Sequence, residues 1–151
     1  MLSWSQIAEA ADAGIEVAAH SRLHPQLDQL PAKLLREELR ASKAQLEDKL
    51  GSPVPGLAYP FGYSNARVRQ MARELGHHYA CAVGNVIAGT ESDLFALPRL
   101  TIRRSTRMTV FQQVVRGSNV QRIFFGDRAL TKGWAMVRRT RAALGSVSHG
   151  Q

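Results

Sequence analysis

Two histidines and an aromatic turn are the residues of this chain best suited to chemistry. His20 and His24 follow the short apolar segment 15–19, and a second apolar segment, 57–59, leads into the turn that Tyr59 to Gly62 form. Strand ends that meet at one edge of an α/β sheet are where ligands and metals bind, so these residues are expected to lie together. Imidazole nitrogens are common ligands of zinc and cobalt. The pattern predicts a divalent-metal site with His20 and His24 as two of its ligands.

The spacing of the histidines leaves two interpretations open. Four residues of separation bring two imidazoles onto one ion when the backbone turns helically, and Ser21 is placed to cap such a turn. Protein zinc sites usually have at least three protein ligands, so a carboxylate from another strand end is expected as the third. The alternative is a hydrogen-bonded pair of surface histidines without a metal.

The elements around these residues alternate between helix and strand. Apolar positions at helical spacing, with glycine or proline at the ends, predict helices over 5–13, 31–50, 65–75, 108–116 and 129–144. Short apolar runs predict strands over 15–19, 57–59, 79–83 and 100–102. The order predicts an α/β fold with a parallel sheet covered by helices. Glu38, Lys43 and Glu47 are expected on the solvated face of helix 31–50, and His77 is expected to contact the C-terminal dipole of helix 65–75.

Composition excludes several classes of protein. The 151 residues are 44% hydrophobic and 21% charged, which is ordinary for a globular domain. Cys81 is the only cysteine, so an internal disulfide is excluded. No apolar run reaches the roughly 18 residues of a membrane span, and the first residues lack the pattern of a signal peptide. We therefore expect a cytoplasmic protein, with membrane association as the alternative.

The positive charge is confined to the C-terminal third. Residues 1–98 contain nine Lys/Arg and eleven Asp/Glu, whereas residues 99–151 contain eleven Lys/Arg and Asp127 as the one acid. The last predicted helix combines arginines with a weak apolar stripe, which is typical of contact with an anionic membrane surface or a partner protein. A solvated basic face is the other main interpretation. Nucleic acid is the least favoured partner, because few aromatic residues interleave the arginines.

Three motifs in one collinear order carry a family resemblance. They are His20-Ser21-x-x-His24-Pro25 after a strand, the helix with Glu38-Leu39-x-x-Ser42-Lys43-x-x-Leu46-Glu47, and Leu57-Ala58-Tyr59-Pro60-Phe61-Gly62 followed by Asn65. Over residues 2–105 the sequence resembles the polysaccharide deacetylases, the NodB homology domain of carbohydrate esterase family 4.

The resemblance implies a metal-dependent carbohydrate deacetylase that removes N-acetyl groups from amino-sugar polymers or their precursors. The expected cofactor is Zn²⁺ or another divalent ion such as Co²⁺, with His20 and His24 as ligands, and the expected partner is an N-acetylated poly- or oligosaccharide. The backbone amide of Phe61 would face the developing oxyanion. The expected substrate-binding residues are Tyr59, Pro60, Phe61, Gly62 and Tyr63.

The sequence also departs from the family pattern. The first motif, Thr-Phe-Asp-Asp-Gly, which supplies the general base and the third ligand, is not found, and no Asp-Asp pair occurs in the 151 residues. Arg103 stands where a histidine general acid is expected, and arginine does not release its proton at neutral pH.

We therefore expect a partial (β/α) barrel-like NodB fold that lacks its first strand or strands. It would comprise a partial deacetylase domain over residues 1–105 and a basic helical extension over residues 106–151. A non-catalytic carbohydrate-binding remnant, and a basic membrane-surface or nucleic-acid-binding protein, are the alternative functions.

Overall fold

The computed structural model of the chain describes residues 2–131, 133 and 134. The chain divides into two compact units, which are described separately below: unit 1 comprises residues 1–82 and 92–97, and unit 2 comprises residues 83–91 and 98–151. This division by compactness is distinct from the family-based boundary at residue 105, which stays a prediction.

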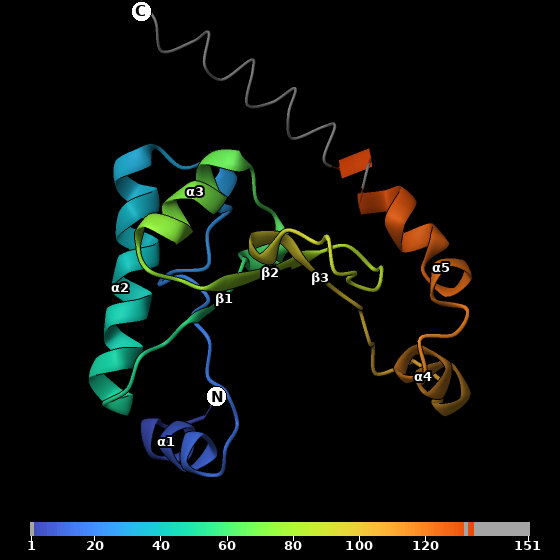
Figure 1. Cartoon of the computed structure of the whole chain (residues 1–151), viewed down its shortest axis with the longest axis horizontal. Coiled ribbons are helices and arrows are strands. Elements are labelled where there is room, and N and C mark those ends of the chain that lie inside the picture. Colours follow the sequence, from blue (N-terminus) through green and yellow to red (C-terminus); the bar gives the residue numbers. More distant parts are fainter. Residues whose placement is uncertain (1, 132, 135–151) are drawn as a thin grey trace, which may run out of the picture. The chain divides into compact units, whose positions relative to one another are not determined.

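The described part of the chain contains helices and three short strands, with α3 between β1 and β2 (Figure 1). The α-helices are α1 (Trp4–Asp12), α2 (Ala32–Leu50), α3 (Ala66–Glu74), α4 (Met108–Val115) and α5 (Val120–Ile123). The strands are β1 (Gly56–Ala58), β2 (Tyr79–Val83) and β3 (Leu97–Arg99), and short 3-10 turns cover Leu27–Gln29 (η1), Pro60–Gly62 (η2) and Leu94–Ala96 (η3). The sheet order is β1-β2-β3, and β1 pairs with β2 in parallel, with Leu57 opposite Ala80. The predicted α/β class with a parallel sheet is confirmed.

Local sequence explains where the helices of unit 1 begin and end. Ser3 caps α1 through a capping box, because its side chain accepts from Gln6 N while the Gln6 side chain accepts from Ser3 N. Asn65 caps α3 by a single contact, in which its side chain accepts from Val68 N at 2.9 Å. Gly51 ends α2 with a φ of 63°, a conformation that glycine adopts without the Cβ clash of other residues. The predicted helices over 5–13, 31–50 and 65–75 are confirmed to within one residue at either end.

Two predicted strands differ from the observed ones. The segment 15–19 contributes only one isolated parallel bridge, between Ala19 and Leu57. Pairing begins there because Ala19 N donates to Gly56 O at 3.0 Å and Ala58 N donates to Ala19 O at 2.8 Å. The last strand is Leu97–Arg99 instead of 100–102, since the chain leaves the sheet when Thr101 N turns to the side chain of Asn85 at 2.8 Å.

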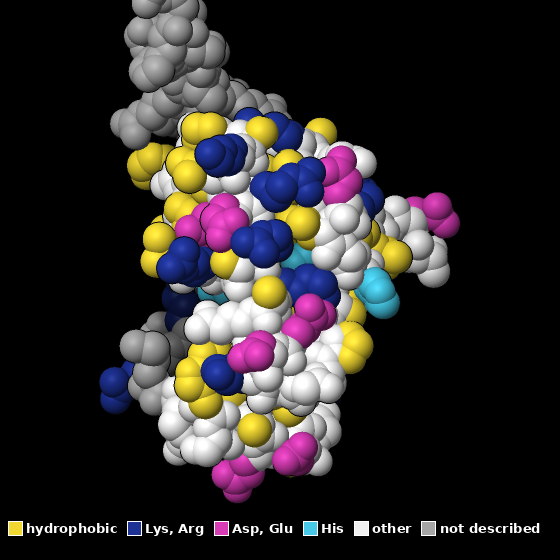
Figure 2. Space-filling view, turned by 90° about the vertical axis from the view of Figure 1, so that its left-hand side faces the viewer, with side chains coloured by type: hydrophobic (Ala, Val, Ile, Leu, Met, Phe, Trp, Pro, Cys, Tyr) yellow, Lys and Arg dark blue, Asp and Glu magenta, His cyan; other side chains and the backbone are white. Residues whose placement is uncertain are grey.

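The charged side of α2 is only partly solvated. Figure 2 shows Lys/Arg and Asp/Glu side chains interspersed over the side of the molecule that carries α2, and Arg40 and Glu37 pair there at 3.1 Å. Lys43 and Glu47, by contrast, hold the loop before β1: Lys43 Nζ donates to Val54 O at 2.8 Å, and Val54 N donates to Glu47 Oε1 at 3.0 Å. The Lys43 ammonium lowers the pKa of the Glu47 carboxyl, and the Val54 amide adds to this shift. The prediction of one continuous solvated face was therefore wrong.

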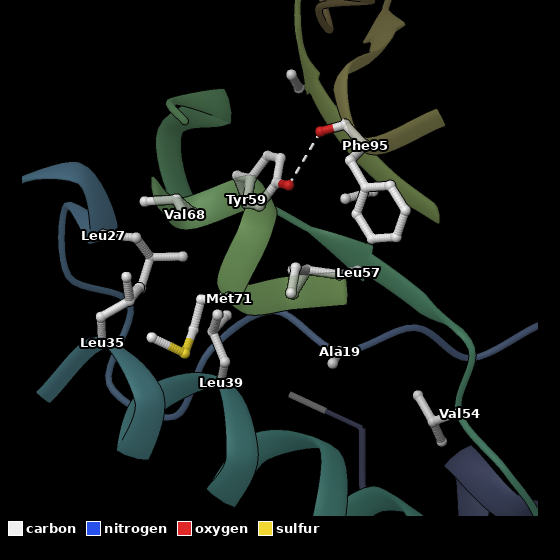
Figure 3. Close-up of a cluster of buried hydrophobic side chains, with 13 residues drawn as sticks. Ala19, Leu27, Leu35, Leu39, Val54, Leu57, Tyr59, Val68, Met71 and Phe95 are labelled. Carbon is white, nitrogen blue, oxygen red and sulfur yellow. Dashed lines mark hydrogen bonds between the residues drawn. The ribbon is translucent and has the colours of Figure 1, made fainter. Parts of the chain in front are cut away.

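The core of unit 1 forms where α2 and α3 pack against β1 (Figure 3). Its fully buried side chains come from the segment before α2, from α2, from β1 and the turn after it, and from α3; they include Leu27, Leu35, Leu39, Leu57, Tyr59 and Val68. Full burial of one such aliphatic side chain contributes about 1.5–3 kcal/mol. This packing fixes β1 and the start of the turn that follows it.

A smaller core holds unit 2 together. Val114 of α4 and Val120 of α5 pack with Phe124, and all three are buried. Arg103 pairs with Asp127 at 2.6 Å, which lowers the pKa of the Asp127 carboxyl. Most of the predicted helix 129–144 lies outside the described residues. No helix in the described part of the chain is long and apolar enough to cross a membrane.

Candidate metal and substrate site

His20 is held at the end of the Ala19 bridge by a hydrogen bond to the neighbouring strand. Its Nδ1 lies 2.6 Å from Ala58 O, the carbonyl at the end of β1. A carbonyl oxygen only accepts, so Nδ1 carries a proton, and in the neutral imidazole Nε2 then has the lone pair. In metal-binding histidines, the ring nitrogen that does not bind the metal commonly donates such a hydrogen bond, which fixes the tautomer and the orientation of the ring. His20 therefore presents Nε2 as a ligand atom.

The backbone between the two histidines is not the helical turn that the spacing predicted. Ser21 and His24 both have positive φ, 62° and 58°, and Ser21 Oγ accepts from His24 N at 3.0 Å. Residues with positive φ do not belong to a right-handed helical turn. The imidazoles nevertheless meet, with ring centroids 4.9 Å apart and planes at 65°.

Glu38 of α2 is a site residue that the sequence analysis placed wrongly on the solvated face. Its side chain is nearly buried, and Oε2 accepts from Arg22 N at 2.9 Å and from Leu23 N at 2.8 Å. A pattern in the sequence could have found it. Leu35, Glu38, Leu39 and Ser42 follow the i, i+3, i+4, i+7 spacing of one helix face, so Glu38 belongs to the buried face of α2.

The turn after β1 holds Phe61 in a left-handed conformation. Phe61 has a φ of 57° and Gly62 a φ of 76°, so two successive left-handed residues follow Pro60. The hydrogen bonds that close the turn run from Gly62 N to Tyr59 O and from Tyr63 N to Pro60 O, and neither uses the N–H of Phe61. A bulky residue rarely adopts positive φ, and such strain gathers at functional sites.

The two segments meet through their rings. The Phe61 ring lies edge-on to His24, with centroids 4.7 Å apart, and stacks on Tyr63 at 6.2 Å with an interplanar angle of 20°. Half of the Phe61 side chain is exposed (51%). The structure therefore brings His20, His24, Phe61 and Tyr63 into one continuous, accessible group.

Tyr59 and Pro60 do not belong to this exposed group. Tyr59 is fully buried, and its hydroxyl donates to Phe95 O at 2.9 Å (Figure 3). Burial raises the pKa of the Tyr59 phenol, so it stays a neutral donor. Tyr59, Pro60 and Gly62 were expected to bind substrate, but all three are buried, and Tyr59 and Pro60 anchor the turn in the core.

The distance between the rings of His20 and His24 is suited to two ligands of one zinc-class ion. Two imidazoles that bind one ion through nitrogens about 2 Å away have ring centres about 5 Å apart at tetrahedral angles, close to the 4.9 Å between His20 and His24. Both rings are exposed at the surface. Among the described residues, no three His, Cys, Asp or Glu side chains form a group that could hold a metal. These residues would thus supply two ligands to such an ion.

Comparisons with known proteins show which family and which solved structures the chain resembles. The sequence model of the family described as Polysaccharide deacetylase matches residues 2–80. No curated protein sequence matches the chain. Among solved structures, the chain resembles the Streptococcus pyogenes deacetylase PplD in complex with acetate, with a TM-score of 0.70 and 26% identity over 74% of this chain and 50% of that one.

The polysaccharide deacetylase BC0361 from Bacillus cereus is similar as well, with a TM-score of 0.65 and 28% identity. That match covers 76% of this chain and 36% of the other. The chain thus spans half, or less, of the length of these relatives. Their fold and the family match agree with a partial NodB deacetylase fold for this chain. The chain belongs to the polysaccharide deacetylase family.

Proposed function

We propose that this chain carries the metal- and substrate-binding part of a deacetylase site that acts on N-acetyl groups of amino-sugar polymers or their precursors. The observation that supports the proposal most strongly is the continuous contact from His20 through His24 and Phe61 to Tyr63. It joins two surface imidazoles to an exposed aromatic side chain and to a strained backbone turn. Membership of the family supplies the reaction class, hydrolysis of an N-acetyl amide.

Each residue of the group has a chemical task in this proposal. His20 and His24 would hold Zn²⁺ or Co²⁺, which when bound would polarise the acetamide carbonyl and lower the pKa of a water molecule. The Phe61 N–H, which the turn does not use, donates to the oxyanion that develops from the carbonyl, a contribution of about 3 kcal/mol to the transition state. Phe61 and Tyr63 offer their faces to the apolar side of the sugar ring.

The chain by itself is expected to bind more readily than it catalyses. The family motif with the general base is not among these residues, and no Asp-Asp pair occurs in the sequence. Arg103, at the position where the acid is expected, is paired with Asp127 in unit 2. We therefore expect saturable sugar binding with little acetate release.

The test uses the full chain, Zn²⁺ and a tetramer of N-acetylglucosamine as the probe. Calorimetry measures binding, and a coupled assay measures free acetate. Phe61→Ala and Tyr63→Ala are expected to weaken binding at least tenfold, since each removes half of the stacked pair. Phe125→Ala, which removes an aromatic side chain that is 73% exposed in unit 2, is the matched control and should bind as the wild type does.

The outcomes separate the candidate functions. Binding that weakens when the metal is chelated supports the deacetylase site. Binding that survives chelation unchanged supports the non-catalytic carbohydrate-binding alternative. If the tetramer does not bind, or binds equally well to the Phe61→Ala chain, the proposal is wrong.

We also propose that unit 2 contacts an anionic membrane surface. Residues 103–126 contain five arginines and no acidic residue. Met108, Phe111 and Val115 share one face of α4 at i, i+3 and i+7, and all three are exposed (67%, 41% and 69%). A helix with an apolar face beside cationic residues is suited to the interface of an anionic bilayer. The apolar stripe favours a membrane over nucleic acid.

A further inference from the structure

One carboxylate of α2 holds the backbone that links the two histidines. We propose that Glu38 is a positioning residue that sets the geometry of His20 and His24 and, through it, their affinity for a divalent ion. The inference rests on the proposed function, because it concerns the same pair of ligands. Glu38 itself touches neither ring in the contacts described above.

The hydrogen bonds of the loop are divided between two side chains. Glu38 Oε2 accepts from Arg22 N and Leu23 N, at 2.9 Å and 2.8 Å, and Ser21 Oγ accepts from His24 N at 3.0 Å. Three consecutive backbone amides between the ligands are thus satisfied by side-chain oxygens. Among the described residues, none of the ion pairs includes Glu38, so these amides are what its carboxylate serves.

The loop needs such support because its conformation is strained. Ser21 and His24 have φ values of 62° and 58°, which side chains with a Cβ adopt at a cost. Positive φ persists at such residues only where the surroundings fix it. Hydrogen bonds from amides to a carboxylate are about twice as strong as those between neutral groups. Glu38 supplies two of them to one stretch of backbone.

Glu38 is itself rigidly placed. It lies on the 19-residue helix α2 and is only 9% exposed, next to the fully buried Leu35 and Leu39. Its anchor is therefore the main core of unit 1. Ala58 O, which orients His20, is joined to the same core through Leu57 and Tyr59. The positions of both histidines therefore depend on the same packed core. A metal site needs its ligands to be held in place in this way.

The experiment compares the full-length wild type with three variants. Glu38→Leu removes the acceptor but keeps an apolar side chain of similar length on the buried face of α2. Glu38→Gln restores a neutral acceptor. Glu37→Ala is the matched control, because Glu37 is the preceding residue on the same helix and pairs only with Arg40 at the surface in the described contacts.

Two measurements are made on each protein. Hydrogen exchange followed by NMR reports the protection of the Arg22 and Leu23 amides without metal, and titration with Zn²⁺ reports affinity. Glu38→Leu is expected to lose at least tenfold in protection at both amides and at least tenfold in zinc affinity. Glu38→Gln should lose only two- to fivefold in each, since an amide oxygen also accepts two N–H groups but forms weaker hydrogen bonds than a carboxylate. Glu37→Ala should match the wild type.

A folded Glu38→Leu chain with wild-type zinc affinity would overturn the inference, because a merely structural glutamate would change stability alone. If the wild type binds no zinc, the proposed function fails, and the exchange measurement then decides the loop separately: unchanged amide protection in Glu38→Leu overturns the positioning role. Should Glu38→Leu not fold, Glu38→Gln decides, with a two- to fivefold loss of protection expected and no loss overturning it.

Discussion

Phe61 combines an exposed aromatic side chain with a strained backbone conformation. Its side chain is half exposed and its φ is 57°, so neither burial nor backbone conformation favours phenylalanine there. Its ring contacts with His24 and Tyr63 offer the functional reason. We therefore expect Phe61 to contribute more to the site than to the stability of the fold.

The first prediction follows from this conflict. Phe61→Gly removes the strain of a left-handed residue, which costs about 1–2 kcal/mol, and loses a ring that is only half buried. The free energy of unfolding, measured by urea denaturation, is expected to stay within about 1 kcal/mol of the wild type or to rise. Affinity for the N-acetylglucosamine tetramer should fall at least tenfold. A destabilisation above about 2 kcal/mol would show that Phe61 is mainly a structural residue.

Side-chain identity predicted the candidate site better than backbone conformation did. The histidines and Phe61 follow from residue types at the ends of apolar segments. The left-handed bends at Ser21 and His24 could not be predicted, since neither is a glycine or asparagine. The burial of Glu38 was not predicted, because a charged residue is usually solvated, although its spacing places it on the apolar face of α2. The partner of His20 Nδ1 is a backbone carbonyl, and backbone groups leave no mark in a sequence.

At the scale of elements, the three helices of unit 1 and the strands over 57–59 and 79–83 were predicted to within one residue, whereas the strands over 15–19 and 100–102 were not. A helix carries its own caps, as Ser3 and Asn65 show. A strand depends on its neighbour, so the apolar segment 15–19 yields a single bridge at Ala19. The register of β1 and β2 likewise depends on pairing between residues more than twenty positions apart.

The end of α3 gives a second prediction. His77 is buried, and burial, with the nearby Lys43 ammonium, lowers the pKa of its imidazole to about 4, from an ordinary 6.5. The expected contact with the C-terminal dipole of the helix would raise the pKa of His77, so burial outweighs it. Between pH 4 and 6.5 the unfolded chain binds more protons than the native one. Stability is full above pH 6.5 and is lost as the pH falls toward 4, by about 3 kcal/mol.

Urea unfolding at pH 7 and pH 4.5 tests this linkage. His77→Leu removes the titrating group and should flatten the pH dependence in this range. His78→Gln changes the exposed neighbour and should leave the wild-type slope. Equal slopes for wild type and His77→Leu would contradict the assignment.

On the scale of the whole molecule, the candidate site and the cluster of arginines belong to different units. The histidine pair and its aromatic surface belong to unit 1, whereas five arginines without an acidic residue lie in residues 103–126 of unit 2. The fold class of unit 1 was predictable from helix and strand periodicity. The extent of unit 2 was not, because the return of residues 83–91 to it depends on contacts such as Asn85 N to Arg99 O.

The membrane proposal for unit 2 gives the third prediction. The full chain should sediment with phosphatidylserine-containing vesicles and not with neutral phosphatidylcholine vesicles, and binding should fall at 0.5 M salt. Replacing Arg104 and Arg107 with alanine is expected to weaken binding about tenfold or more, since each basic residue near such a surface contributes about 1 kcal/mol. Equal binding to both kinds of vesicle, or tighter binding to DNA than to either, would contradict it.

Zinc titration of the full chain tests the central claim, that His20 and His24 bind one divalent ion together. Calorimetry of the wild type is expected to give one zinc ion per chain, and His20→Ala and His24→Ala should each reduce the affinity at least tenfold. His78→Gln, which changes an exposed histidine after α3, should bind as the wild type does. Zinc binding of equal strength in the wild type and in both alanine variants would contradict the account.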